Sequence, residues 1–224
     1  MLSLTNRLSL AASMVRRGSI VCDVGTDHAY LPSYLVMNDI CPSALACDIG
    51  ELPLWSAKKT IEKYGLSDRI QLILSDGLER VAAGSFDDLV IAGMGGDTIV
   101  HIISNAPWLK DARYRLILQP MTHSEDVRRL LFENGFSISR EECIDEGQKT
   151  YLAIMAQYSG DFSERSEFEI YFGVQEISAQ AEIYRLRQLK RLQSRLDGLL
   201  LSVGDNEETQ TIRRILSEYK GENL

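Results

Sequence analysis

Short apolar runs alternate with longer segments of helical periodicity from the start of the chain to about residue 158. The apolar runs are bounded by turn residues and predict buried strands at 19–23, 43–48, 69–74, 87–92 and 115–118. The periodic segments predict helices at 5–17, 96–105 and 124–134, and another that passes through Ala57 and Ile61 and stops at Gly65. This alternation is typical of βαβ units, and it predicts an α/β fold with a mostly parallel sheet.

Two further apolar runs, 136–142 and 150–158, follow with no helix between them, and the segment 145–148 supplies a turn. These runs predict an antiparallel hairpin at the edge of the sheet. Five βα units closed by a hairpin form the strand plan of a Rossmann-like class I methyltransferase domain, which we assign to residues 1–160. A dinucleotide-binding dehydrogenase would more often end with a parallel sixth strand.

The pattern changes after residue 160, where strand signals vanish and apolar residues recur at heptad spacing. The first set is Val174, Ile177, Ala181 and Tyr184, and after a one-step slip the second is Leu189, Leu192, Leu196, Leu199 and Val203. Gly204 can end that helix, and a last helix has its apolar face at Ile212, Ile215, Leu216 and Tyr219. We therefore predict an antiparallel, coiled-coil-like helical hairpin as a small second domain over residues 161–224.

Composition narrows the class of protein. Hydrophobic residues make up 45% and charged residues 25%, which is ordinary for a globular protein, and no apolar stretch is long enough to span a bilayer. No signal peptide is visible, so we expect a cytoplasmic protein, as a monomer or weak dimer, without a membrane partner. The four cysteines form no CxxC pair and no zinc spacing, so we expect reduced, buried thiols and no metal.

Polar or glycine-rich clusters follow four successive predicted strands, at the ends where parallel sheets bind ligands. They are Asp23-Val-Gly-Thr-Asp-His28, Asp48, Ser75-Asp-Gly-Leu78 and Ala92-Gly-Met-Gly-Gly96. The acids can accept hydrogen bonds from ribose hydroxyls and an adenine amino group, while the missing GxGxxG argues against a nicotinamide cofactor. Each cluster alone could be an ordinary turn, and their order along the chain favours a nucleoside-containing cofactor. Gln119, after the fifth strand, can hydrogen-bond a base edge.

The segments DVGTDHAYLP (23–32), SDGL (75–78), IAGMGG (91–96) and QP (119–120) resemble the bacterial tRNA adenine-N1 methyltransferases of the TrmK type. The similarity runs through residues 1–158. It implies S-adenosylmethionine as cofactor and methylation of N1 of the adenine at tRNA position 22. Two departures are Thr26, where serine is expected, and Met121, where asparagine is expected after the QP pair.

Carried over by motif, the resemblance implies a set of cofactor-binding residues: Asp23, Gly25, Thr26, Asp27, His28, Asp48, Ile49, Asp76, Gly77, Leu78, Ala92, Gly93, Met94 and Gly95. It implies that Tyr30, Met94, Gly96 and Pro120 contact the target base. For catalysis we hypothesise from position that Asp27 stabilises the charge that forms on the base, or takes a proton, while Gln119 orients the base.

A basic run on the first predicted C-terminal helix is the expected tRNA contact: Arg185, Arg187, Lys190, Arg191 and Arg195. Arg7, Arg16 and Arg17 add a second basic group, although the formal net charge of −8 argues weakly against nucleic acid. The run could instead be a solvated helix face. A methyltransferase with another RNA or a small-molecule substrate, a nicotinamide-dependent oxidoreductase and an inactive RNA-binding module remain the alternatives.

Overall fold

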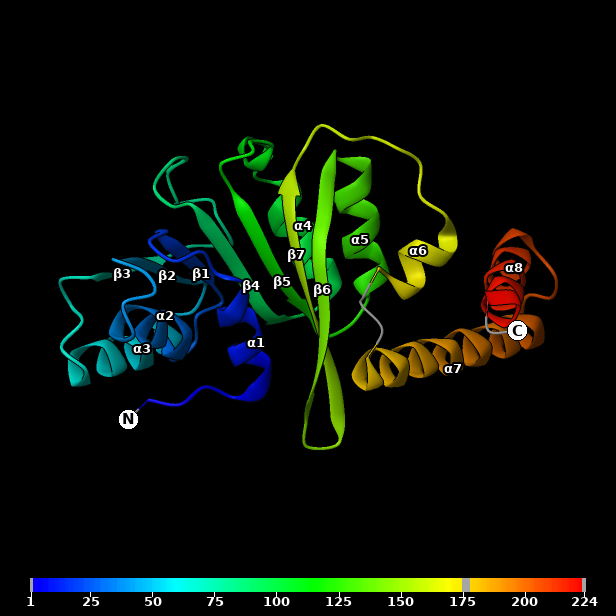
Figure 1. Cartoon of the computed structure of the whole chain (residues 1–224), viewed down its shortest axis with the longest axis horizontal. Coiled ribbons are helices and arrows are strands. Elements are labelled where there is room, and N and C mark those ends of the chain that lie inside the picture. Colours follow the sequence, from blue (N-terminus) through cyan, green and yellow to red (C-terminus); the bar gives the residue numbers. More distant parts are fainter. Residues whose placement is uncertain (1, 175–177, 223–224) are drawn as a thin grey trace.

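One sheet organises the computed structural model, which describes residues 2–174 and 178–222. Its strand order over this part of the chain is β3-β2-β1-β4-β5-β7-β6 (Figure 1). The strands are β1 (Val21–Val24), β2 (Ala44–Asp48), β3 (Ile70–Leu74), β4 (Asp88–Met94), β5 (Arg115–Pro120), β6 (Phe136–Glu146) and β7 (Lys149–Tyr158). The first five are parallel and β7 is antiparallel to both β5 and β6, which confirms the predicted fold class.

Helices cover both faces of the sheet, which is why the parallel strands are apolar along their length. The apolar side chains of α1 (Asn6–Met14), α2 (Tyr30–Met37) and α3 (Glu51–Lys63) pack on one face, around Val21, Ala46 and Val90. Those of α4 (Gly96–Ser104) and α5 (Ser124–Glu133) pack on the other, around Cys22, Leu89 and Ile91. A short 3₁₀ helix, η1 (Pro107–Leu109), follows α4. Successive strand residues thus point to opposite faces, each into its own core.

The hairpin is longer than predicted, and its turn is tighter. β6 and β7 pair up to Glu146 and Lys149, so Gly147 and Gln148 alone form the turn, and Gly147 takes the left-handed conformation with φ of 62°. β5 pairs with β7 only from Ile154 to Gln157, so the tip projects past the carboxyl ends of the parallel strands (Figure 1). The start of α1 holds this tip, since the Asn6 side-chain amide donates to the Asp145 carbonyl oxygen at 2.7 Å.

Three helices follow the sheet: α6 (Glu167–Phe172), α7 (Ala179–Ser202) and α8 (Glu207–Glu222). Helix α8 folds back on α7, since Arg195 pairs with Glu208 and the Tyr219 hydroxyl donates to Glu182 at 3.4 Å. The helical hairpin is therefore present. The division into domains at residue 160 stays a prediction. No described helix is long and apolar enough to cross a membrane.

The heptad prediction was wrong at its start. Val174 lies in a loop because the chain leaves α6 at Gly173, which has φ of 76°, and Ile177 lies outside the described residues. Helix α6 itself was not predicted, although it carries a readable start signal. The Ser166 hydroxyl accepts from the Glu169 amide, and the Glu169 carboxylate accepts from the Ser166 amide, which is a capping box.

A buried arginine ties these helices to the sheet. Arg128 on α5 is fully buried, and its Nε donates to the Glu141 carboxylate of β6 at 2.7 Å. Its remaining nitrogens donate to the Ile170 carbonyl of α6 at 3.0 Å and to the Tyr184 hydroxyl of α7 at 3.3 Å. One guanidinium therefore fixes the positions of α6 and α7 relative to β6.

Candidate active site

The loop after β1 is held in an unusual backbone conformation. Gly25, Asp27 and Ala29 all have positive φ, at 77°, 49° and 53°. A left-handed conformation costs a residue with a side chain about 1–2 kcal/mol, so Asp27 and Ala29 are strained. The Gly25 and Thr26 amides both donate to the Cys47 carbonyl oxygen of β2 at 2.9 Å, which secures the loop. Strain that the surrounding fold maintains is typical of functional sites.

Two predicted acids, Asp23 and Asp48, meet at this loop. Asp23 is 5% exposed, and its carboxylate accepts a hydrogen bond from the Thr26 hydroxyl at 2.7 Å. Burial raises the pKa of Asp23 to about 6; the Thr26 hydrogen bond lowers it and the nearby Asp48 charge raises it. Asp48 accepts from the Asp27 amide at 3.1 Å and from the Gly50 amide at 3.0 Å. Asp48 therefore joins the first and second strand ends, and it does not cap α3, whose N-cap is Gly50.

The third and fourth clusters lie at the same edge of the sheet. Asp76 is exposed, whereas Gly77 and Leu78 are buried, and a Cβ on Gly77 would lie 2.9 Å from Ile102 Cγ1. In the fourth cluster the Met94 side chain extends to Gly25, where a Cβ would lie 2.1 Å from Met94 Cε. Glycine at position 25 thus satisfies both the backbone conformation and the close approach of β4's end.

Gly96 joins this edge to the next loop. A Cβ at Gly96 would lie 2.3 Å from the His123 carbonyl oxygen and 2.7 Å from that of Thr122, so only glycine allows α4 to begin so close to the β5–α5 connection. The Gly96 amide donates to the Thr122 carbonyl at 2.9 Å. The other predicted residues of this cluster, Ala92, Gly93 and Gly95, are half-buried or exposed.

Of the predicted residues beside Asp27, two form an exposed aromatic pair. The His28 and Tyr30 rings stack with centroids 5.2 Å apart and planes 13° apart, and Tyr30 is 43% exposed. His28 Nε2 lies 3.7 Å from an Asp27 carboxylate oxygen. Ile49, predicted from the second strand end, is 68% exposed.

Gln119 lies deeper than its predicted role requires. It is 1% exposed, its amide nitrogen donates to the Pro120 carbonyl at 3.3 Å, and its amide oxygen accepts from Arg7 Nη1 at 3.3 Å. The amide is therefore engaged within the protein, and it supports the loop of Pro120, which is buried, and Met121, which is 42% exposed. The sequence placed Arg7 only in a basic group near the N-terminus and gave no link to Gln119, because no local pattern connects residues that are 112 positions apart.

The second basic group is not one surface. Arg16 is a structural residue: its Nε and its amide each donate at 2.7 Å to the fully buried Asp88 carboxylate, and its Nη2 donates to the Asp87 carbonyl at 2.9 Å. The expectation that Arg16 belongs to a tRNA-facing group was wrong, because its guanidinium compensates a buried charge. Arg17 is exposed.

The basic run on α7 is partly neutralised by acids from other elements. Arg191 pairs with Glu125 of α5 at 2.6 Å, and Arg195 pairs with Glu208 of α8. Arg187 donates to the Gln148 carbonyl at the hairpin tip at 3.0 Å, and Lys190 is exposed. Arg185 is half-buried and makes interactions of its own. The run therefore carries less uncompensated positive charge than the lack of acids within it suggests.

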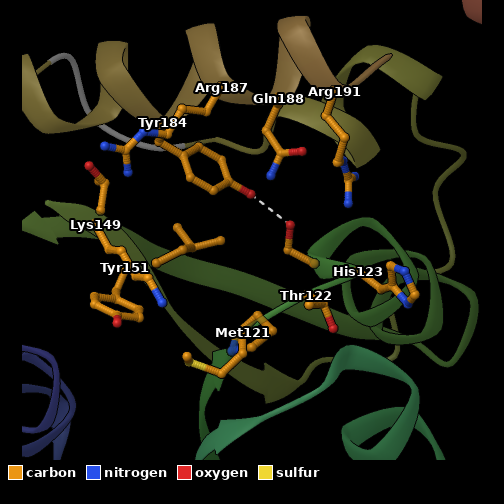
Figure 2. A pocket seen from close by; sticks show the side chains of 13 residues that line it. Met121, Thr122, His123, Lys149, Tyr151, Tyr184, Arg187, Gln188 and Arg191 are labelled. Atoms are coloured by element: carbon orange, nitrogen blue, oxygen red, sulfur yellow. Dashed lines mark hydrogen bonds between the residues drawn. The ribbon is translucent and has the colours of Figure 1, made fainter. Parts of the chain in front are cut away.

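A pocket of about 350 Å³ lies between α7, the projecting part of β7 and the β5–α5 connection (Figure 2). Its lining includes Pro120 and Met121 at one side and Lys149, Tyr184 and Arg187 at the other. Sequence reasoning did not anticipate it, because its walls come from segments far apart in the chain.

Close to this pocket, Asp97, His123 and Asp126 bring possible metal-binding atoms within 4.8 Å of one another. All three residues are exposed, and His123 Nδ1 lies 3.0 Å from Asp97 Oδ2. An exposed pair of this kind links the start of α4 to the β5–α5 connection. By itself it does not define a metal site.

A parallel sheet closed by an antiparallel hairpin, with acidic and glycine-rich strand ends at one edge, is the architecture of class I methyltransferases. A family model described as a methyltransferase domain matches residues 4–154. A tRNA (adenine(22)-N(1))-methyltransferase of Bacillus subtilis (strain 168) is 38% identical over 160 residues, which cover 71% of this chain and 67% of the relative.

Solved structures agree over nearly the whole chain. The crystal structure of the B. subtilis m1A22 tRNA methyltransferase TrmK matches with a TM-score of 0.81 and 28% identity, and covers 98% of this chain and 97% of that one. The structure of M. capricolum TrmK in complex with S-adenosyl-homocysteine matches with the same TM-score and 30% identity, with 98% and 97% covered. The chain belongs to the TrmK family of methyltransferases.

Proposed function

We propose that this protein transfers the methyl group of S-adenosylmethionine to N1 of adenine 22 in tRNA. The observation that carries the proposal is the convergence of the predicted clusters on one edge of the sheet, where Asp48 hydrogen-bonds the strained Asp27 loop next to buried Asp23. The family to which the chain belongs, and the named activity of its Bacillus subtilis relative, support the same reaction.

The residues at this edge fit the cofactor. Asp23, Asp48 and Asp76 lie at the ends of three neighbouring strands, β1, β2 and β3. Carboxylates suit the cofactor's ammonium group, its ribose hydroxyls and its adenine amino group, in that order along the sheet. The bound cofactor supplies a methyl group activated by its sulfonium. Gly25 lets the Met94 side chain lie against the loop after β1, because a Cβ at position 25 would overlap Met94 Cε.

The chain's own contribution to the reaction is alignment and charge. Adenine N1 carries a free lone pair once the base is unpaired, so the site needs chiefly to hold it in line with the methyl group. Asp27 is exposed, and its backbone amide donates a hydrogen bond to the Asp48 carboxylate. We infer that the Asp27 carboxylate stabilises the cationic product ring. The stacked His28 and Tyr30 rings offer a surface for a base extruded from the tRNA. Gln119 acts through the Pro120–Met121 loop that it supports.

The test is transfer of radiolabelled methyl from S-adenosylmethionine to unmodified tRNA, followed by nucleoside analysis. We expect label in 1-methyladenosine, and none when position 22 of the tRNA carries guanine. Label in another nucleoside, or none despite measured cofactor binding, would keep the fold and reject this substrate.

The same assay addresses Asp27. We expect Asp27→Ala to lower kcat about 100-fold or more, in the range typical of a lost acid–base or electrostatic group, with cofactor Kd changed far less. Asp68→Ala is the matched control, because Asp68 is also exposed but precedes β3, at the amino ends of the parallel strands. Equal losses in kcat and cofactor affinity would reduce Asp27 to a cofactor ligand.

A further inference from the structure

The pocket beside α7 has the size and the polarity of a ligand site. Its volume of about 350 Å³ falls within the range of about 300–1,000 Å³ that small-molecule sites occupy. The hairpin tip forms one wall, α7 a second, and the β5–α5 connection a third (Figure 2). The Tyr184 hydroxyl and the Ser124 hydroxyl hydrogen-bond at 2.6 Å across its base, which joins the second and third walls. This bond therefore fixes the second and third walls relative to each other.

The charge lining this pocket is positive and only partly compensated. Arg191 is neutralised by the nearly buried Glu125. Lys149 is exposed and forms no ion pair within the described residues, and Arg187 donates only to a backbone carbonyl, that of Gln148. Two cationic side chains thus line the pocket, Lys149 from the hairpin tip and Arg187 from α7 (Figure 2), and together they suit a phosphate.

A buried side-chain oxygen that lacks a partner indicates the kind of group that enters the pocket beside the phosphate. The Gln188 side-chain oxygen is buried and has no hydrogen-bond partner within the described residues, and the side chain extends from α7 into the pocket (Figure 2). Leaving such a group unsatisfied is unfavourable, so a ligand that donates a hydrogen bond to it gains affinity. A primary amide pairs well with the donor and acceptor atoms on the edge of a nucleobase. Tyr151, from the opposite wall, adds a ring on which a base can stack.

The position of the pocket separates it from the target adenine. The cofactor-binding loops end β1, β2 and β3, and the Met94 loop ends β4, whereas the pocket lies over β7, two strands beyond β4. Neighbouring strands are about 4.8 Å apart, so the pocket is roughly 10 Å from the methyl-transfer position. Pro120 and Met121, which border the expected base site, also line this pocket.

We propose that this pocket binds a nucleotide adjacent to the target adenine, with its phosphate between Lys149 and Arg187 and its base edge on Gln188. The proposal rests on the proposed function and goes beyond it, because it assigns a discrete subsite for one neighbouring nucleotide. Held there, the neighbour would anchor the strand so that the extruded adenine reaches the cofactor.

The test measures binding, so that it does not depend on catalysis. Fluorescence anisotropy of a labelled tRNA gives Kd for the wild type and for Gln188→Ala, using intact tRNA and tRNAs that lack the base on either side of adenine 22. We expect loss of one of these bases to weaken wild-type binding about fivefold to tenfold and to have no further effect on Gln188→Ala. Additive losses at both neighbours would overturn the proposal.

Lys149→Ala tests the contact with the phosphate, and we expect the variant to fold normally because Lys149 is exposed. Each phosphate contact contributes roughly 0.7–0.9 to the slope of log Kd against log salt, so the variant's slope should fall by about that amount. Lys110→Ala is the control, since Lys110 is exposed beyond η1 at the opposite edge of the sheet and should keep the wild-type slope. An unchanged slope in Lys149→Ala would also overturn the proposal. If tRNA binds as expected but no methyl group is transferred, the proposed function fails and this subsite does not.

Discussion

The two halves of the carboxyl edge of the sheet differ in charge and in origin. The cofactor half, at the ends of β1 to β3, presents Asp23, Asp48 and Asp76. The nucleotide half, between β7, α7 and the β5–α5 connection, presents Lys149 and Arg187. A net charge of −8 for the whole chain describes neither half. In the proposed arrangement, a cationic cofactor and an anionic substrate bind at one edge because each half carries the opposite charge to its ligand.

The halves also differ in how the chain builds them. Each acid of the cofactor half lies on or just after its own strand, so the strand places it. The nucleotide half joins residues that are 39 positions apart at Arg187 and Gln148 and 60 apart at Ser124 and Tyr184. The geometry of the nucleotide half therefore depends on tertiary contacts. Different substitutions should therefore impair tRNA binding and cofactor binding.

The largest effect is expected where the nucleotide half is tied to the core. Arg128→Met leaves the Glu141 carboxylate buried without its cation, so the free energy of unfolding should fall by about 3–5 kcal/mol. Since Arg128 also bonds α6 and α7, tRNA Kd should rise more than cofactor Kd. Urea unfolding and the two binding measurements check both statements.

The neighbouring arginine is the control for this substitution. Arg129 forms a two-bonded pair with Glu167 at 2.9 and 2.8 Å, but both side chains are partly exposed. Arg129→Met should therefore cost only about 0–1 kcal/mol. Equal costs at the two positions would mean that Arg128 does not hold the helices as described.

A smaller effect is expected at the junction of the halves. Gly96→Ala places a methyl group against the backbone of Thr122 and His123, which cannot yield as a side-chain end can, and should cost about 1–3 kcal/mol. The shifted β5–α5 connection should lower kcat. Gly198→Ala is the matched control: nothing lies near that position in α7, so it should stabilise the protein by about 0.5–1 kcal/mol. A neutral Gly96→Ala in thermal unfolding and in kcat would contradict the close packing of the junction.

The smallest effect is a pH dependence confined to the cofactor half. Asp23 has a raised pKa of about 6, so it loses its charge as pH falls from 7 to 5, and cofactor affinity should fall by at most about tenfold per pH unit below 6. Its raised pKa means that this carboxyl itself favours folding more at pH 5 than at pH 7, so unfolding through Asp23 does not explain the loss. Calorimetric titrations at pH 5 to 8 should show that the cofactor Kd of the wild type depends steeply on pH and that the Kd of Asp23→Asn depends on it much less. The same slope in Asp23→Asn would assign the dependence to another group.

Structure that is local can be predicted from the sequence. Strands, the edge hairpin and the acidic strand ends follow from apolar periodicity and turn residues over a few positions. A role that depends on a distant partner cannot: Arg16 resembles a surface cation, yet Asp88, 72 positions away, makes it structural. Arg191 and Arg195 read as free cations until α5 and α8 supply their acids. Helix α6 was overlooked because its six residues make fewer than two turns, too few to show a periodicity.

The bond between Asn6 and the Asp145 carbonyl has a consequence for synthesis on the ribosome. Its partners are 139 positions apart, as are those of the bond from the Arg7 amide to the Glu146 carboxylate. At about 5–20 residues per second, the first helix emerges roughly 7–28 seconds before the strand that anchors its start has been made. During that interval the growing chain must keep the apolar face of this helix away from other molecules. The nascent protein therefore exposes an apolar helix face near its beginning, and completion of the hairpin supplies the bonds that hold the start of this helix.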